Sequence, residues 1–152
     1  MPFEALLKND TYQVFLFTCP ASVPVNFVRH PWFVINQKGK VERWEVFFRP
    51  DPRKEHWGHL HRNAFLPTQG IPVLYPWEKF LWKGRIEGYI EGGEGSLAHQ
   101  MAKVIASSPQ TYPHLNHYAL TGINSNTYAR WVLNQFPNSG LKLPWNALGT
   151  TL

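Results

Sequence analysis

Two polar residues far apart in the chain have the types that acyl-transfer chemistry needs: a serine opening a predicted helix and a histidine opening a predicted strand. Ser125 lies in the polar turn Gly122-Ile-Asn-Ser-Asn-Thr127. Negative charge is stabilised at a helix start by unpaired backbone N–H groups and by the helix dipole. Such a position suits a nucleophile, with neighbouring N–H groups as an oxyanion hole. Ser and Asn are also favoured helix caps, so a purely structural role for the turn stays open.

His30 is the candidate general base, since a carboxylate on the neighbouring strand would hold its tautomer. Residues 30–36 and 41–49 flank Gln-Lys-Gly-Lys, a pattern that predicts a β-hairpin. If Gln37 pairs with Lys40, His30 shares a face with Glu45, which then becomes the orienting residue. A slip of one residue would present Glu42 instead. An ordinary half-buried histidine is the structural alternative.

A histidine cluster and a lone cysteine offer other chemistry. His56, His59 and His61 are spaced so that they could converge on zinc, copper or nickel. No acid or cysteine stands at a recognisable motif spacing, so we expect hydrogen-bonded loop histidines, no metal site and no cofactor. Cys19 could be a thiolate nucleophile on the strand beside His30. Lone cysteines are more often small buried hydrophobes, and no neighbour in the sequence would lower the pKa of this one.

Composition describes a single domain over residues 1–152. Hydrophobic residues make up 43% and charged residues 16% of the chain, which excludes disorder and long solvated helices. The net charge is +5, but the basic residues are scattered, so we expect no specific nucleic-acid surface. No Asp or Glu follows Glu94, so any catalytic carboxylate comes from the first 94 residues.

Targeting signals are missing from the sequence. The longest apolar runs are far shorter than the roughly 20 residues of a membrane helix, so we expect no membrane span. The first residues lack the basic and apolar regions of a secretory signal, and we expect a cytoplasmic protein. Oligomeric state leaves no mark on the sequence.

The order of the elements predicts how these residues are positioned. Residues 11–18 form a strand, the hairpin follows, and residues 50–78 are irregular with a short strand at 73–75. Residues 80–90 form a strand broken at Gly84 or Gly88. A helix capped by Ser96 ends at Ser108-Pro109, and a second helix runs from the Asn124-Ser125 turn to residue 135. Strands first and helices last predict an α+β fold, an antiparallel sheet with helices on one side.

Two C-terminal segments carry a resemblance to a bacterial family, domain of unknown function 3750. They are Gly122-Ile-Asn-Ser-Asn-Thr-Tyr128 and Leu143-Pro-Trp-Asn-Ala-Leu-Gly149. The family's typical segments are Gly-Pro-Asn-Ser-Asn-Thr-Phe and Leu-Pro-x-x-Ala-x-Gly. Cys19-Pro20 and His30-Pro-Trp32 also look similar to the family's N-terminal half. The resemblance spans residues 11–149 and implies no activity.

A more distant resemblance implies an activity. In circularly permuted papain-like proteins, such as NlpC-type peptidases and lecithin retinol acyltransferase, a strand-borne histidine precedes an Asn-Cys-x-x-Phe segment that opens a helix. His30 and Asn124-Ser125-x-x-Tyr128 follow the same order. Glu45 or Glu42 would supply the third polar position, and Asn124 or Asn126 would position groups around an oxyanion. Serine stands where the cysteine would act, and a hydroxyl needs concerted proton removal.

The resemblance therefore implies two functions. One is a papain-like hydrolase or acyltransferase with Ser125 as nucleophile, His30 as base and Glu45 as orienting residue. The other is an inactive binding module for a peptide, glycan or acyl ligand. Its small-molecule or peptide partner would pack beside the helix start, against aromatic residues that include Trp32, Trp44 and Trp57.

Overall fold

The fold is seen in a computed structural model that describes residues 1–21, 28–48, 55–72, 81–119 and 122–148. An antiparallel sheet of six strands, in the order β4-β5-β3-β2-β1-β8, forms its centre. The strands are β1 (Tyr12–Pro20), β2 (Arg29–Gln37), β3 (Lys40–Val46), β4 (Glu55–Trp57), β5 (Leu60–Arg62) and β8 (Arg85–Gly92). A separate two-stranded ribbon consists of β6 (Gln69–Pro72) and β7 (Leu81–Lys83).

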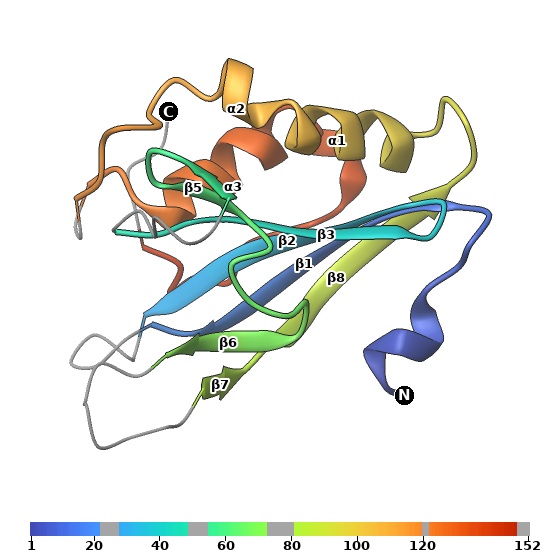
Figure 1. Ribbon diagram of the computed structural model, residues 1–152, viewed down its shortest axis with the longest axis horizontal. Coiled ribbons are helices and arrows are strands. Elements are labelled where there is room, and N and C mark those ends of the chain that lie inside the picture. Colours follow the sequence, from blue (N-terminus) through green and yellow to red (C-terminus); the bar gives the residue numbers. More distant parts are fainter. Residues whose placement is uncertain (22–27, 49–54, 73–80, 120–121, 149–152) are drawn as a thin grey trace.

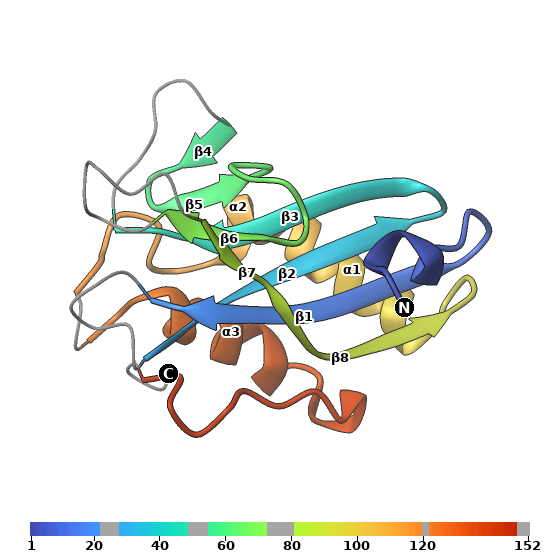
Figure 2. The same cartoon turned by 90° about the horizontal axis from the view of Figure 1, so that it is seen from below.

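Helices cover one face of this sheet (Figure 1). They are α1 (Leu97–Ala106), α2 (Ser108–Thr111) and α3 (Ser125–Asn134), with short 3-10 turns η1 (Phe3–Leu6) and η2 (Pro137–Ser139). α1 packs on β1 and β8, and α3 packs on β2 and β3. Figure 2 shows β6, β7 and the N-terminal turn η1 in front of the sheet, with the helices behind it. The predicted α+β fold, with an antiparallel sheet and helices on one side, is confirmed.

The sheet therefore separates two apolar cores. The helix-side core lies between the sheet and the helices and includes Leu16, Phe33, Met101 and Tyr128. The opposite-face core lies beneath β6 and η1 and consists of Phe3, Phe15, Phe17, Cys19, Trp32, Val34 and Ile71. Alternate residues of a strand point to opposite faces, so β1 and β2 supply both cores and are buried along most of their length.

The predicted hairpin register is confirmed. Gln37 pairs with Lys40, and Val34 pairs with Arg43. His30 therefore lies on the same face as Trp32, Arg43 and Glu45, as the alternation of side chains requires. This face is the one turned away from helices α1 and α3.

Local signals explain most element boundaries. Ser96 caps α1 by accepting a hydrogen bond from the backbone N–H of His99. The strand predicted over residues 80–90 breaks at Gly84, one of the two expected positions. A Cβ at Gly84 would lie 2.6 Å from the Trp32 ring, so the backbone can pass this ring only with glycine.

The structure differs from the prediction within residues 50–78 and at Ser108-Pro109. The region expected to be irregular contributes the edge strand β4 and its neighbour β5, each only three residues long, and the four-residue strand β6. Such short strands leave no readable alternation in a sequence. The predicted stop at Ser108-Pro109 is instead the first turn of α2, because proline is tolerated in the first turn of a helix. The strand predicted at 73–75 lies outside the described residues.

Candidate functional site

Helix α3 begins in a network built by its own sequence motif. Asn124 is the N-cap, and its side-chain oxygen accepts from the backbone N–H of Asn126 at 3.0 Å. Thr127 completes a capping box, since its hydroxyl accepts from the backbone N–H of Asn124 at 3.0 Å. Tyr128 is 1% exposed and lies in the helix-side core, where its hydroxyl meets that of Ser108 at 2.9 Å.

The C-terminal motif is tied to the start of α3. The Asn126 amide donates to the carbonyl oxygens of Leu148 at 2.8 Å and Arg29 at 3.1 Å. The Asn124 amide also reaches the Leu148 carbonyl, at 3.2 Å. Arg130 donates to the carbonyl of Ala147 at 2.5 Å. These bonds join the two C-terminal segments to one another and to the first residue of β2.

Ser125 differs from Asn124, Asn126 and Thr127 because its side chain forms no hydrogen bond with a described residue. It is the first residue of α3 and is 5% exposed. Neither its hydroxyl nor its backbone N–H forms a hydrogen bond with any residue that the structure describes. Asn124, not Ser125, is the cap, so the expected capping role falls on the neighbour. The Oδ1 atom of Asn126, one residue on, is buried and also has no hydrogen-bond partner among the described residues.

His30 and Glu45 lie together, as the register predicted. His30 Nε2 is 2.8 Å from Glu45 Oε2, and the two residues are 5% and 0% exposed. Arg43 donates two hydrogen bonds to the same carboxylate, from Nε to Oε1 at 2.6 Å and from Nη2 to Oε2 at 2.8 Å. Burial would raise the pKa of Glu45, but Arg43 and His30 outweigh it and hold the pKa below its usual value.

The histidine and the serine are not hydrogen-bonded to one another within the described residues. His30 stacks on Phe47, with ring centroids 5.4 Å apart, on the face of the sheet turned away from α3. Across the described part of the chain, no hydrogen bond joins His30 to Ser125. The structure thus joins the predicted base to its orienting residue by a hydrogen bond, and within the described residues it forms no such bond between either of them and the predicted nucleophile.

Glu42, the alternative orienting residue, belongs to the other face of β3. One of its oxygens lies 3.1 Å from Lys40 Nζ and 3.6 Å from an Arg62 nitrogen. The other accepts from the indole of Trp44 at 3.3 Å. The Glu42 carboxylate therefore interacts with other side chains on the face opposite to His30.

The two tryptophans proposed as ligand contacts are buried in this structure. Trp32 is 0% exposed, donates to the carbonyl of Pro67 at 2.8 Å and packs under the Arg43 guanidinium. Trp44 is 1% exposed and stacks on Trp57 in the helix-side core region. Both tryptophans support the sheet from opposite faces rather than line an open surface.

The three histidines expected in a loop lie in the β4–β5 hairpin, where His56 and His61 belong to the strands and His59 to the turn. His59 Nδ1 lies 2.8 Å from the carbonyl of Phe47, and His61 Nδ1 lies 2.9 Å from the carbonyl of His59. The rings of His56 and His61 are 5.7 Å apart. Within the described ranges, no group of three or more His, Cys, Asp or Glu side chains is arranged to hold a metal ion.

Cys19 is paired with His30 across β1 and β2 and lies in the opposite-face core. It is 0% exposed, and burial raises the pKa of its thiol to about 11. Such a thiol is protonated at neutral pH and closed to solvent, which is the reverse of what a nucleophile needs.

One polar cluster was not anticipated from the sequence. Arg29 donates to the Thr18 hydroxyl at 2.9 and 3.2 Å, and Thr18 donates to Glu87. Arg85 donates to the same Glu87 oxygen at 2.8 and 3.0 Å. Glu87 is thus bound directly by the Arg85 guanidinium and through Thr18 by that of Arg29, at the end of the sheet where α3 begins. The pairing of Thr18 with Arg85 across β1 and β8 brings this cluster together. The sequence could have predicted the cluster only if the register between these two distant strands were known.

The model of one family matches residues 11–152, and its description is protein of unknown function (DUF3750). The chain belongs to the DUF3750 family. Searches of curated proteins and of solved structures return no match. The segments that resemble the DUF3750 family are those that interlock in the structure, since Asn124 and Asn126 bind the carbonyl of Leu148. Among the described residues, no helix is long and apolar enough to cross a membrane.

Proposed function

We propose that the protein is a ligand-binding domain of papain-like, circularly permuted NlpC-type architecture. In this proposal, the helix start that carries the nucleophile in active relatives of that architecture binds a ligand instead of reacting with it. The observation that carries the proposal is the state of Ser125. Its hydroxyl and N–H are uncommitted at the start of α3, and no base is hydrogen-bonded to it among the described residues.

The chemistry of this position favours a ligand that presents hydrogen-bond acceptors. Ser125 offers an O–H and an N–H side by side, at the positive end of the α3 dipole. A carbonyl or carboxylate group would accept from both. Peptides, N-acylated glycans and acyl groups all contain such a group.

The buried oxygen of Asn126 adds a second preference. An unpaired buried acceptor costs about 1–3 kcal/mol, so this end of α3 is stabilised by any group that brings a donor to it. An amide carries an N–H next to its carbonyl and would complement both Asn126 and Ser125. Amide-bearing ligands are therefore the first to test.

The order of the histidine and the serine along the chain supports the papain-like architecture, whereas the position of the histidine side chain favours binding over catalysis. The chain order, a histidine-bearing strand followed late by a helix-opening Asn-Ser, is that of permuted papain-like proteins. The histidine side chain, however, belongs to the opposite-face core side of β2 and is held there by Glu45. A helix start without a base is suited to binding and poorly suited to removing a proton from serine.

Nuclear magnetic resonance titration tests this function directly. The ¹⁵N-labelled chain would be titrated with N-acetyl-dipeptides, N-acetylglucosamine and short acyl amides, one class at a time. We expect saturable amide shifts at residues 124–127 with at least one class, and weaker binding in Ser125→Ala. Ser139→Ala removes a hydroxyl elsewhere and is the matched control. Absence of saturable shifts at residues 124–127 with all classes contradicts the proposal.

The His30–Glu45 pair favours a second candidate, a serine hydrolase or acyltransferase. A carboxylate at 2.8 Å fixes the orientation of the imidazole, and the other ring nitrogen forms no hydrogen bond with a described residue. Catalysis would require a rearrangement that brings this nitrogen to Ser125. It predicts ester or amide turnover that both Ser125→Ala and His30→Gln abolish, and turnover that survives either change excludes this mechanism.

A further inference from the structure

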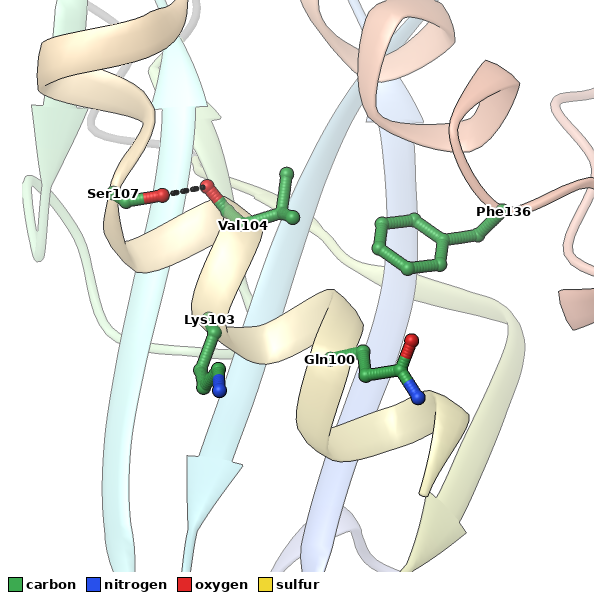
Figure 3. A pocket seen from close by; sticks show the side chains of 5 residues that line it. All are labelled: Gln100, Lys103, Val104, Ser107 and Phe136. Atoms are coloured by element: carbon green, nitrogen blue, oxygen red, sulfur yellow. Dashed lines mark hydrogen bonds between the residues drawn. The ribbon is translucent and has the colours of Figure 1, made fainter. Parts of the chain in front are cut away.

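A groove on the helical layer lies away from the start of α3. It has a volume of about 630 Å³ and is lined by Gln100, Lys103, Val104 and Ser107 of the α1 region and by Phe136. Figure 3 shows the Phe136 ring, which follows the C-terminal end of α3, directed towards the side of α1 that carries Gln100 and Val104. Since α3 has ten residues and is about 15 Å long, this groove and Ser125 lie at opposite ends of that helix.

The groove combines an apolar wall with the side chain of Lys103, a cation that has no ion-pair partner in the described ranges. Val104 is partly buried and Phe136 is 8% exposed, and both pack on the helix-side core. Ser107 donates its hydroxyl to the carbonyl of Val104 at 3.1 Å and so offers no free donor. Lys103 is exposed and forms no ion pair with any described residue.

Charge in this part of the chain is one-sided. Residues 95–152 contain no Asp or Glu, so the segment that builds α1, α2 and α3 has lysine and arginine but no carboxylate of its own. An anionic group that approaches Lys103 meets no like charge from these elements. An incoming carboxylate therefore complements both the cation and the surrounding layer.

The size of the groove decides between a small molecule and a protein partner. A stable protein interface uses about 20–30 residues on each side, whereas five of the described residues line this groove. Its volume falls within the range of about 300–1,000 Å³ typical of small-molecule sites. Gln100 and Ser107 are separated by about 10 Å along α1, which suits a short linear ligand.

We propose that this groove binds an unbranched aliphatic carboxylate, a short fatty-acid anion. The alkyl chain would pack on Val104 and Phe136, and the carboxylate would pair with Lys103. This site is independent of the function proposed for Ser125, because no residue is shared between them.

Titration of the ¹⁵N-labelled chain with sodium octanoate tests the inference. We expect saturable shifts at residues 100–107 and 136 and none at 124–127. Hexanoate should bind more weakly than octanoate, by up to about 4-fold for each methylene lost. Lys103→Gln should weaken octanoate binding about 2- to 5-fold, whereas Lys142→Gln, a matched surface change outside the groove, should leave it unaltered.

One further variant and two further ligands test the proposal. Gln100→Trp places a large ring over the groove from an exposed position and should abolish the saturable shifts. Octanol should bind more weakly than octanoate to the unmodified chain and should not respond to Lys103→Gln. Equal binding of octanol and octanoate, equal effects of the two lysine changes, or shifts that do not saturate would each refute a carboxylate site. Tighter binding of an acidic peptide at the same residues would refute the assignment to a small molecule.

Discussion

His30 Nε2 and Glu45 Oε2 lie 2.8 Å apart on the face of the sheet turned away from helix α3. Arg43 holds the same carboxylate through two hydrogen bonds, so a buried charge on β3 is matched by groups from β2 and β3. Buried ion pairs of this kind are maintained by geometry, and removing one partner leaves the other charge uncompensated. The pair therefore bears on the stability of the central hairpin as well as on function.

Replacement of Glu45 should be costly. In Glu45→Gln, the buried Arg43 guanidinium loses its counter-charge, and we expect a loss of about 3 kcal/mol in the free energy of unfolding. Glu55→Gln is the matched control, because Glu55 pairs with Arg62 on the exposed edge and should contribute less than about 1 kcal/mol. Urea denaturation measures both. Similar losses in the two variants would show that the buried network is energetically unimportant.

The same carboxylate predicts how stability depends on pH. The folded-state pKa of Glu45 lies below its ordinary value, so its contribution is complete above about pH 4.3. It is lost as the pH falls through the folded-state pKa, because the protonated carboxyl no longer balances Arg43. The stability difference between the unmodified chain and Glu45→Gln should shrink below about pH 4. Denaturation at several pH values from neutral to acid measures this, and a difference independent of pH contradicts it.

Cys19 should be unreactive in the folded chain. Its thiol is buried and burial raises its pKa to about 11, so little thiolate exists at pH 8 and none of it meets solvent. A colorimetric disulfide reagent should react with Cys19 only after unfolding in urea. Rapid stoichiometric reaction of the native protein would show that the cysteine is open and would reinstate it as a candidate nucleophile.

Asn126 should contribute to stability through the segments that it joins. Asn126→Ala removes donors from the carbonyls of Arg29 and Leu148, and we expect a loss of about 1–3 kcal/mol. Asn134→Ala, an exposed position at the other end of α3, is the matched control and should change stability by less than about 0.5 kcal/mol. Thermal unfolding of both variants compares the two effects. An equal change would mean that the two segments do not stabilise one another.

Residue patterns predicted those parts of the fold that depend on local signals. The Gly39 turn set the hairpin register, and that register placed Glu45 beside His30. Ser96 marked the start of α1 through its capping hydrogen bond. Strands β4 and β5 escaped prediction because three residues give no period. β5 is stabilised by pairing with β3, and β4 by pairing with β5.

The site was less predictable because it depends on which face each side chain takes. The alternation of side chains along β2 places His30 on the same face as Trp32. Nothing in the local sequence, however, predicts on which face of the sheet α3 packs. Helix α3 packs on the face opposite to the one that carries the His30 side chain. Trp32 and Trp44 looked like ligand contacts, whereas the structure uses them as core residues on opposite faces.

Covalent labelling of Ser125 tests the central claim most directly. The chain would be incubated with a fluorophosphonate at pH 8 and its intact mass measured, with Ser125→Ala and His30→Gln alongside. Because no base is hydrogen-bonded to the Ser125 hydroxyl among the described residues, we predict no adduct on the unmodified chain. A stoichiometric adduct that disappears in both Ser125→Ala and His30→Gln would contradict the binding function and establish a catalytic serine.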